Sequence, residues 1–183
     1  MSRRALLQVA GSAALVFAGC SDTDTPPESA GRDSGVEREI RGFQLSETQA
    51  GRLIWELHAD TAWRIPKDTQ VHLEEVEVRF FDQDGRLDSR LTSRRGLVDE
   101  ATGTMTAKED VRLISVNQDT LTTQELVYLK DEDLVRGPGA VRLAKPDRVV
   151  TGFEFEAKPD LTTYEIHRDV RITLVGDRRD GTP

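Results

Sequence analysis

The sequence predicts an all-β fold, a folded-over antiparallel β-jelly roll built from repeats of about 30 residues with two strands each. Two recurring phrases carry this prediction. Valine, arginine and an apolar residue return at steps of 33, 30 and 29 residues, in Val78–Phe80, Val111–Leu113, Val141–Leu143 and Val170–Ile172. A second phrase keeps the same order, in Leu57–Ala59, Leu91–Ser93, Leu121–Thr123 and Val149–Thr151. Two phrases per period of this length indicate a stacked architecture in which each repeat supplies two strands.

Apolar and charged side chains alternate along most of this region, which is the pattern of half-buried strands. Residues 53–62 also fit one or two helical turns, but the alternation of Trp55, Leu57 and Ala59 favours a strand. Further strands are expected at 76–80, 164–167 and 170–174. Near the end of the region the alternation predicts one strand with a single apolar face formed by Val149, Thr151, Phe153, Phe155 and Ala157.

Clusters of aspartate, glycine and proline separate the predicted strands and indicate turns. They lie at Asp82–Gly85, Asp99–Gly103, Asp131–Asp133, Gly137–Gly139 and Lys158–Asp160. The first begins like a calcium loop, but it lacks the third acidic position and the closing glutamate, so a hairpin turn is predicted there.

The N-terminal residues predict a lipoprotein signal peptide over 1–19. Arg3 and Arg4 form a basic region, an apolar stretch runs to Phe17, and small residues precede Cys20. The apolar stretch is shorter than the roughly 20 residues that span a bilayer. Cys20, the only cysteine, is then the expected lipid attachment site. The arginine pair leaves the general and the twin-arginine export routes both open.

The chain divides by composition into four parts. After the signal peptide, residues 20–35 comprise the cysteine and a polar tether that cannot bury enough apolar surface to fold. A tether of this length has a reach of roughly 20 Å. Residues 36–175 form one β-jelly-roll domain, and residues 176–183 form a polar tail. The domain is therefore expected to lie close to a membrane surface.

Composition and motifs argue against an enzyme and against nucleic acid as a partner. The chain has 33 acidic and 25 basic side chains, and loss of Arg3 and Arg4 with the signal peptide leaves a formal charge of −10. Such a protein gains nothing from long-range attraction to an anionic ligand, so acyl contact is expected to outweigh phosphate capture. His58, His72 and His167 lie in different repeats without metal-ligand spacing. No metal and no cofactor are expected.

An apolar interior of modest size is expected between the folded-over faces, because only 37% of the residues are hydrophobic and 5% are aromatic. A partly open interior gives room for a lipid tail. Exposing an acyl chain of a dozen carbons to water costs on the order of 10 kcal/mol, so a groove must cover it continuously. Each apolar residue that is expected to face inward either contacts the lipid or only packs in the core. These candidates are Leu57, Leu73, Val78, Phe80, Leu91, Met105, Val111, Leu113, Leu126, Tyr128, Val141, Leu143, Phe153, Phe155, Tyr164 and Ile166.

The folded part resembles the LptC family of periplasmic lipopolysaccharide-export proteins along its whole length. The matching segments are Phe43–Thr48, Gly51, Trp55–Leu57, Val76–Phe81, Leu91–Ser93, Gly96–Asp99, Met105–Ala107, Asp110–Val111 and Thr151–Phe153. The resemblance implies a twisted β-jelly roll that docks on an inner-membrane ABC transporter and passes lipopolysaccharide to a related periplasmic bridge protein. Many members have an N-terminal transmembrane helix, where this chain has a lipobox.

The same resemblance suggests where the partners bind and in which membrane the anchor lies. Gly51 resembles a family glycine of the transporter side, and Gly152 one of the bridge side; the alternative for each is an ordinary turn or bulge glycine. Replacing either is expected to leave the domain folded. The resemblance implies the inner membrane, whereas Ser21 after the cysteine leaves the outer membrane as an alternative. The alternative function is a β-repeat lipoprotein that acts as a structural or adhesive interaction module without lipid transfer.

Overall fold

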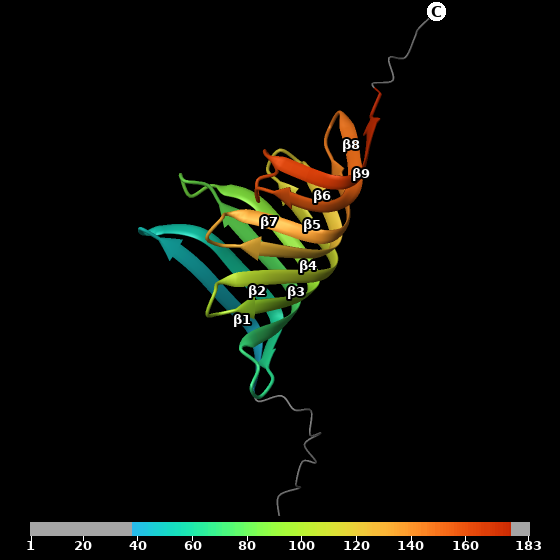
Figure 1. Cartoon of the computed structure of the whole chain (residues 1–183). Coiled ribbons are helices and arrows are strands. Elements are labelled where there is room, and N and C mark those ends of the chain that lie inside the picture. The colour runs from blue at the N-terminus through green and yellow to red at the C-terminus, as the bar shows by residue number, and fades with distance from the viewer. Residues whose placement is uncertain (1–37, 177–183) are drawn as a thin grey trace, which may run out of the picture. The chain divides into compact units, whose positions relative to one another are not determined.

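Nine antiparallel strands form one sheet in the part of the chain that the structure, a computed structural model, describes, residues 38–176 (Figure 1). The strands are β1 (Arg38–Gln49), β2 (Arg52–Arg64), β3 (Gln70–Phe81), β4 (Leu87–Asp99), β5 (Thr104–Ser115), β6 (Thr120–Leu129), β7 (Leu134–Ala144), β8 (Arg148–Ala157) and β9 (Tyr164–Leu174). Over these residues there is no helix long and apolar enough to cross a membrane.

Each strand pairs with the next strand in the chain, so the sheet is a continuous meander with β1 and β9 at its two edges (Figure 1). The Val-Arg-apolar phrases lie in β3, β5, β7 and β9, and the second phrases lie in β2, β4, β6 and β8. Two strands per repeat, the all-β jelly roll and the strand over 53–62 are thereby confirmed.

A line of β-bulges crosses the sheet near the middle of its strands. The register shifts in each of the five pairs from β4–β5 to β8–β9. Bulged residues such as Glu109, Asp110 and Glu154 have positive φ angles of 63°, 54° and 55°. A bulge bends its strand and increases the local twist. The sheet can therefore fold over itself and enclose an apolar interior without breaking any strand.

The bulges overturn two expectations from the sequence. Gly137–Gly139 is not a turn but the bulge within β7, between residues that pair with β8 on both sides. Val149, Thr151 and Phe153 were expected to face inward, yet the buried residues in this part of β8 are Val150 and Gly152, and Phe153 is 41% exposed. The register of β8 with β9 shifts between Thr151 and Phe153, and Glu154 has a positive φ, so Gly152 faces inward before the bulge and Phe155 after it. Simple alternation fails there because one extra residue reverses which side chains face the core.

The hairpin turns form as their sequences predict. Asp82 Oδ1 accepts hydrogen bonds from the backbone N–H groups of Asp84 and Arg86, at 2.8 and 2.9 Å. Gly85 follows with a φ of 77°, which glycine adopts without strain. This carboxylate is thus committed to closing a hairpin, as predicted in preference to a calcium loop.

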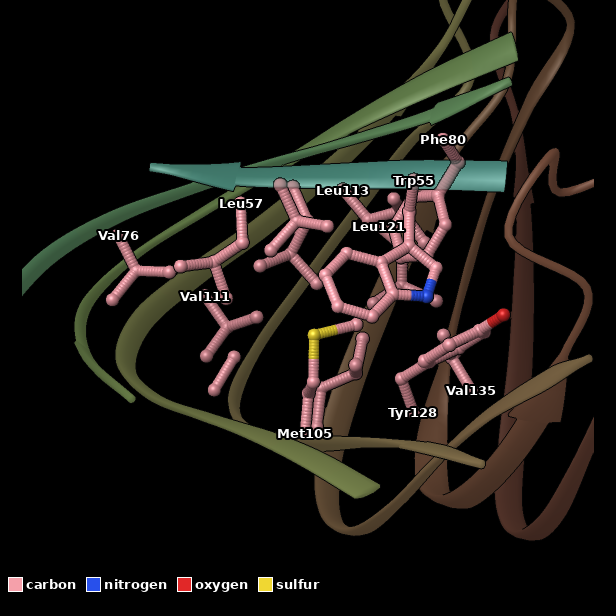
Figure 2. Close-up of a cluster of buried hydrophobic side chains, with 14 of the residues drawn as sticks. Trp55, Leu57, Val76, Phe80, Met105, Val111, Leu113, Leu121, Tyr128 and Val135 are labelled. Atoms are coloured by element: carbon pink, nitrogen blue, oxygen red, sulfur yellow. The ribbon is translucent and has the colours of Figure 1, made fainter. Parts of the chain in front are cut away.

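The core is one continuous cluster between the folded-over faces. Figure 2 shows Trp55 of β2, Met105 of β5 and Tyr128 of β6 gathered around a common centre. Phe80 and Tyr128, from strands that do not pair, have ring centroids 5.1 Å apart. Core side chains come from every strand between β2 and β8. The interior is therefore shared by all the central repeats.

Candidate lipid-binding interior and sheet edges

The interior contains almost all of the side chains that the sequence assigned to a lipid groove. Tyr164 and Ile166 are partly buried against the core, and Phe153 is the exception. The remaining thirteen are buried in the core cluster: Leu57, Leu73, Val78, Phe80, Leu91, Met105, Val111, Leu113, Leu126, Tyr128, Val141, Leu143 and Phe155. Their position is as predicted. Whether they contact lipid stays a prediction.

Sequence reasoning missed several large side chains that share this interior. Trp55, Val76, Leu121 and Val135 are all buried in the cluster (Figure 2). The alternation of β2 and β3 already placed Trp55 and Val76 on the inward face, so their signal was present. Val135 has the same parity along β7 as the predicted inward residues Val141 and Leu143, so its signal was present as well.

The interior is closely packed, which differs from the open slot that the modest apolar content suggested. The cavity between Leu57, Phe80, Met105 and Tyr128 has a volume of about 20 Å³. This is room for roughly one water molecule. An acyl chain therefore cannot enter without a separation of the two faces. The apolar residues suffice to fill the interior because the inward-facing side chains of β2–β8 are mostly large and pack in one cluster.

One end of the interior opens into a hollow of about 560 Å³ between the β1–β2, β3–β4, β6–β7 and β8–β9 turns. Phe80 and Tyr128 reach it from the core. Lys130 Nζ lies 2.6 Å from Glu47 Oε1 and thereby joins the first strand to the β6–β7 turn. This ion pair spans strands that do not hydrogen-bond to each other. It therefore links two sides of the hollow, hereafter the mouth.

Carboxylates surround the mouth. The Tyr128 hydroxyl lies 3.4 Å from Asp133 Oδ1, and burial followed by the charge of Asp133 raises the pKa of this phenol, so it stays protonated and donates. Burial also raises the pKa of Asp88, and the charges of Asp160 and Asp82 add to the effect. The mouth is therefore a poor binding site for an anion, which agrees with the expected dominance of acyl contact in the interior.

The two edge strands differ in how well they are covered. Phe43 and Leu45 of β1 pack against the core. In contrast, the apolar side chains at the end of β9 have no cover: Val170 is 51% exposed, Ile172 60% and Leu174 75%. An edge strand with unpaired backbone groups and bare apolar side chains is a template for another sheet. The β9 edge is the strongest candidate surface for a protein partner.

The two glycines that the sequence singled out have different local environments. Gly51 lies in the β1–β2 turn with a φ of 80° and open space around its α-carbon, so the turn conformation alone requires glycine. Gly152 is buried where β8 meets β9. A β-carbon there would lie 2.5 Å from Ile166 Cγ2 and 2.7 Å from the carbonyl oxygen of Arg168. Its backbone approaches β9 too closely for any side chain.

The histidines and acids form no metal centre among residues 38–176. His72 Nε2 lies 2.7 Å from Asp68 Oδ2, and its ring stacks on Trp63 with centroids 5.6 Å apart. The hydrogen bond from His72 lowers the pKa of Asp68. His58 instead lies 3.1 Å from Glu56 Oε1. Each contact is a local pair on a strand or turn.

Several sequence predictions fall outside the described residues. The signal peptide over 1–19, the lipid attachment at Cys20, the tether and the tail after residue 176 are among them. They stay predictions.

Comparisons with known proteins identify the family of this chain. No curated protein matches the chain. A model of the family described as "Lipopolysaccharide-assembly, LptC-related" matches residues 6–175, most of the chain. This match and the nine-stranded jelly roll agree with the resemblance seen in the segments from Phe43 to Phe153. The chain belongs to the LptC family, whose members are periplasmic components of lipopolysaccharide transport associated with the inner membrane.

Proposed function

We propose that this chain receives lipopolysaccharide from an inner-membrane ABC transporter and passes it to a related periplasmic bridge protein, with the acyl chains carried between the two faces of its sheet. The observation that carries the proposal is the continuous apolar cluster that runs through every strand from β2 to β8. Such a path can cover an acyl chain along its whole length, and that cover is worth about 0.8 kcal/mol per methylene.

Opening the packed interior is feasible because the sheet is not a closed barrel. β1 and β9 do not pair with each other, so the roll can widen without the loss of any strand-to-strand hydrogen bond. The contacts that oppose widening are side-chain contacts: the apolar packing of the core, which includes the Phe80–Tyr128 ring contact, and the Glu47–Lys130 ion pair at the mouth. We infer that the described conformation is the closed one.

The interior also contains polar groups that a lipid can satisfy. Trp55 Nε1 and the hydroxyls of Ser89 and Ser115 are buried with no hydrogen-bond partner among residues 38–176. A buried unpaired donor costs about 1–3 kcal/mol. The carbonyl oxygens of acyl esters or amides would accept from these groups, so part of the cost of opening would be offset when a lipid enters.

The edges supply the docking surfaces in this account. β1 lies toward the transporter and β9 toward the bridge protein, whose own edge strand would pair with β9 and cover Ile172 and Leu174. Gly51 and Gly152 lie near these two edges, which supports a role for each in the corresponding partner contact. A head-to-tail series of sheets would then extend the apolar interior from one protein to the next.

Lipid attachment at Cys20 predicts a soluble variant. Cys20→Ala is expected to release the folded domain from membranes, because no other part of the mature sequence is long and apolar enough to anchor it. Fractionation of cells that lack the transporter measures this. Complete retention of the variant in the membrane fraction would rule out the lipid anchor.

Photocrosslinking tests the interior path. A photoreactive residue at Phe80, Leu113 or Phe155 is expected to label lipopolysaccharide in cells, because these side chains are at most 4% exposed and face the interior. The matched control is Glu154, which faces outward next to the same bulge. Equal labelling from inside and outside would refute the path.

A structural or adhesive interaction module is the second candidate, and the close packing of the interior favours it. Such a module needs a filled core and exposed edges but never opens. Interior positions would then label no lipid at all, while the β9 edge would still bind a partner.

A further inference from the structure

Three arginines form a row across the outer face of the sheet. Arg112 of β5 pairs in register with Thr122 of β6, which pairs with Arg142 of β7. Arg142 in turn pairs with Thr151 of β8, and Thr151 with Arg171 of β9. The row therefore follows directly from the repeated phrases in the sequence. Each exposed arginine is the middle residue of a Val-Arg-apolar phrase, and threonines of the second phrase lie between them.

The three guanidinium groups of this arginine row have no partner among the described residues. Every other arginine whose side chain the structure describes contacts an acidic side chain or a backbone carbonyl oxygen. The contacts are those of Arg41, Arg52, Arg64, Arg79, Arg86, Arg90, Arg94, Arg95, Arg136, Arg148 and Arg168. In a chain with an excess of acids, three unpaired arginines in one row mark a local basic site.

In the first repeat, acidic side chains neutralise the equivalent arginine. Arg79 is the equivalent residue in β3, and its guanidinium contacts Glu56 at 3.0 Å and Glu77 at 2.7 Å. In the arginine row, threonines occupy the register position where Arg79 has Glu56. The later repeats thus keep the arginine but lack the equivalent of Glu56. Asp110 and Asp169 stand where Glu77 does in the first repeat, and neither pairs with Arg112 or Arg171 among the described residues.

The arginine row lines a groove of about 680 Å³ on the outer face. Phe153, which the bulge in β8 turns outward, lies in the same groove. Two carboxylates border it: Asp110, already paired with Arg94 at 2.8 Å, and Asp169. The groove therefore has a net positive charge, hydroxyls of Thr122 and Thr151, and one apolar wall.

The spacing of the arginines sets the ligand. Neighbouring strands lie about 4.8 Å apart, so arginines on alternate strands are about 10 Å apart along the row. Each can bind one phosphate with two parallel hydrogen bonds. A concave surface accepts a ligand that enters it, whereas a flat bilayer surface would contact mainly the rim.

We propose that the groove binds a saccharide carrying two or more phosphate groups, the chemistry of a lipopolysaccharide headgroup. The proposal rests on the proposed function for the identity of the lipid, and it adds a second contact outside the interior. The arginines bind the phosphates, the threonine hydroxyls bind sugar hydroxyls, and Phe153 covers an apolar sugar face. The groove would hold a headgroup on the outer face of the strands that lead to the β9 edge.

The test uses the full chain in detergent and measures binding of deacylated, phosphorylated lipopolysaccharide saccharide by calorimetry. Exchanging Arg112, Arg142 and Arg171 for glutamine is expected to weaken binding at least tenfold. The control exchanges Arg79, Arg86 and Arg136 for glutamine, which removes the same charge from paired positions and is expected to leave affinity within twofold. Raised salt should weaken binding to the wild-type chain.

Further probes separate the sources of phosphate. The dephosphorylated saccharide should not bind, and inorganic phosphate should bind much more weakly than the saccharide because it engages one arginine at a time. Equal affinity of wild type and the triple variant, equal affinity for the dephosphorylated saccharide, or binding only to vesicles of anionic phospholipid would each overturn the proposal. Photocrosslinking from the interior positions of the wild-type chain is measured in parallel. If these positions label no lipopolysaccharide while the chain still binds the saccharide, the interior lipid path is refuted and the phosphate-binding groove is supported.

Discussion

Gly152→Arg is expected to detach β9 from the sheet while β1–β8 stay folded. The new β-carbon would lie 2.5 Å from Ile166 and 2.7 Å from the backbone of Arg168, and backbone cannot move aside as a flexible side chain can. Overpacking of this kind costs about 1–3 kcal/mol and sometimes more. β9 pairs only with β8, so its release is the cheapest way to relieve the clash. The sequence-based expectation that the whole domain stays folded is revised accordingly.

Limited proteolysis with mass spectrometry measures this effect. The variant should be cut between residues 158 and 174 far faster than the wild type, and pull-down of the bridge protein should be lost. Gly139→Ala is the matched control, because a β-carbon there meets nothing within 4 Å and the glycine lies at the corresponding bulge of β7. Protection of β9 equal to that of the wild type would show that Gly152 acts through direct partner contact instead.

The fold could be predicted because the recurring phrases mark alternate strands of a simple meander. Each Val-Arg-apolar phrase put its valine and its apolar residue on one face, and Val111, Leu113, Val141 and Leu143 are buried as that pattern requires. Alternation fails only at the bulges. Phe153 faces outward because its strand shifts register there, and no period-2 pattern contains that shift.

Two properties of the site, the packing of the interior and the local charge of the outer face, depend on contacts between strands. They could therefore not be predicted from the sequence. Composition suggested an open interior, but packing density depends on how side chains from opposite faces interdigitate, and the cavity is only about 20 Å³. Net charge likewise does not reveal the local basic groove that the arginine row lines. The Arg79–Glu56 ion pair and the isolation of Arg112 appear only when the register places Glu56 beside Arg79 and threonines beside Arg112.

Locking the mouth tests most directly whether lipid enters by separation of the faces. Glu47 and Lys130 would be replaced by cysteines and joined by a short bifunctional thiol reagent, which fixes β1 to the β6–β7 turn where the ion pair now holds them. A control joins cysteines at Arg136 and Glu156, which already pair across adjacent strands. Variants with a single one of these cysteines control for reaction with Cys20.

The measurement is labelling of lipopolysaccharide by a photoreactive residue at Phe80, in the full chain with and without each link. We expect the Glu47–Lys130 link to reduce labelling at least tenfold, because the packed interior has no room for an acyl chain until its faces separate. The Arg136–Glu156 link should leave labelling unchanged, since it ties together strands that move as one. If the variant with the Glu47–Lys130 link is labelled as strongly as the unlinked chain, lipid does not enter by opening of the roll.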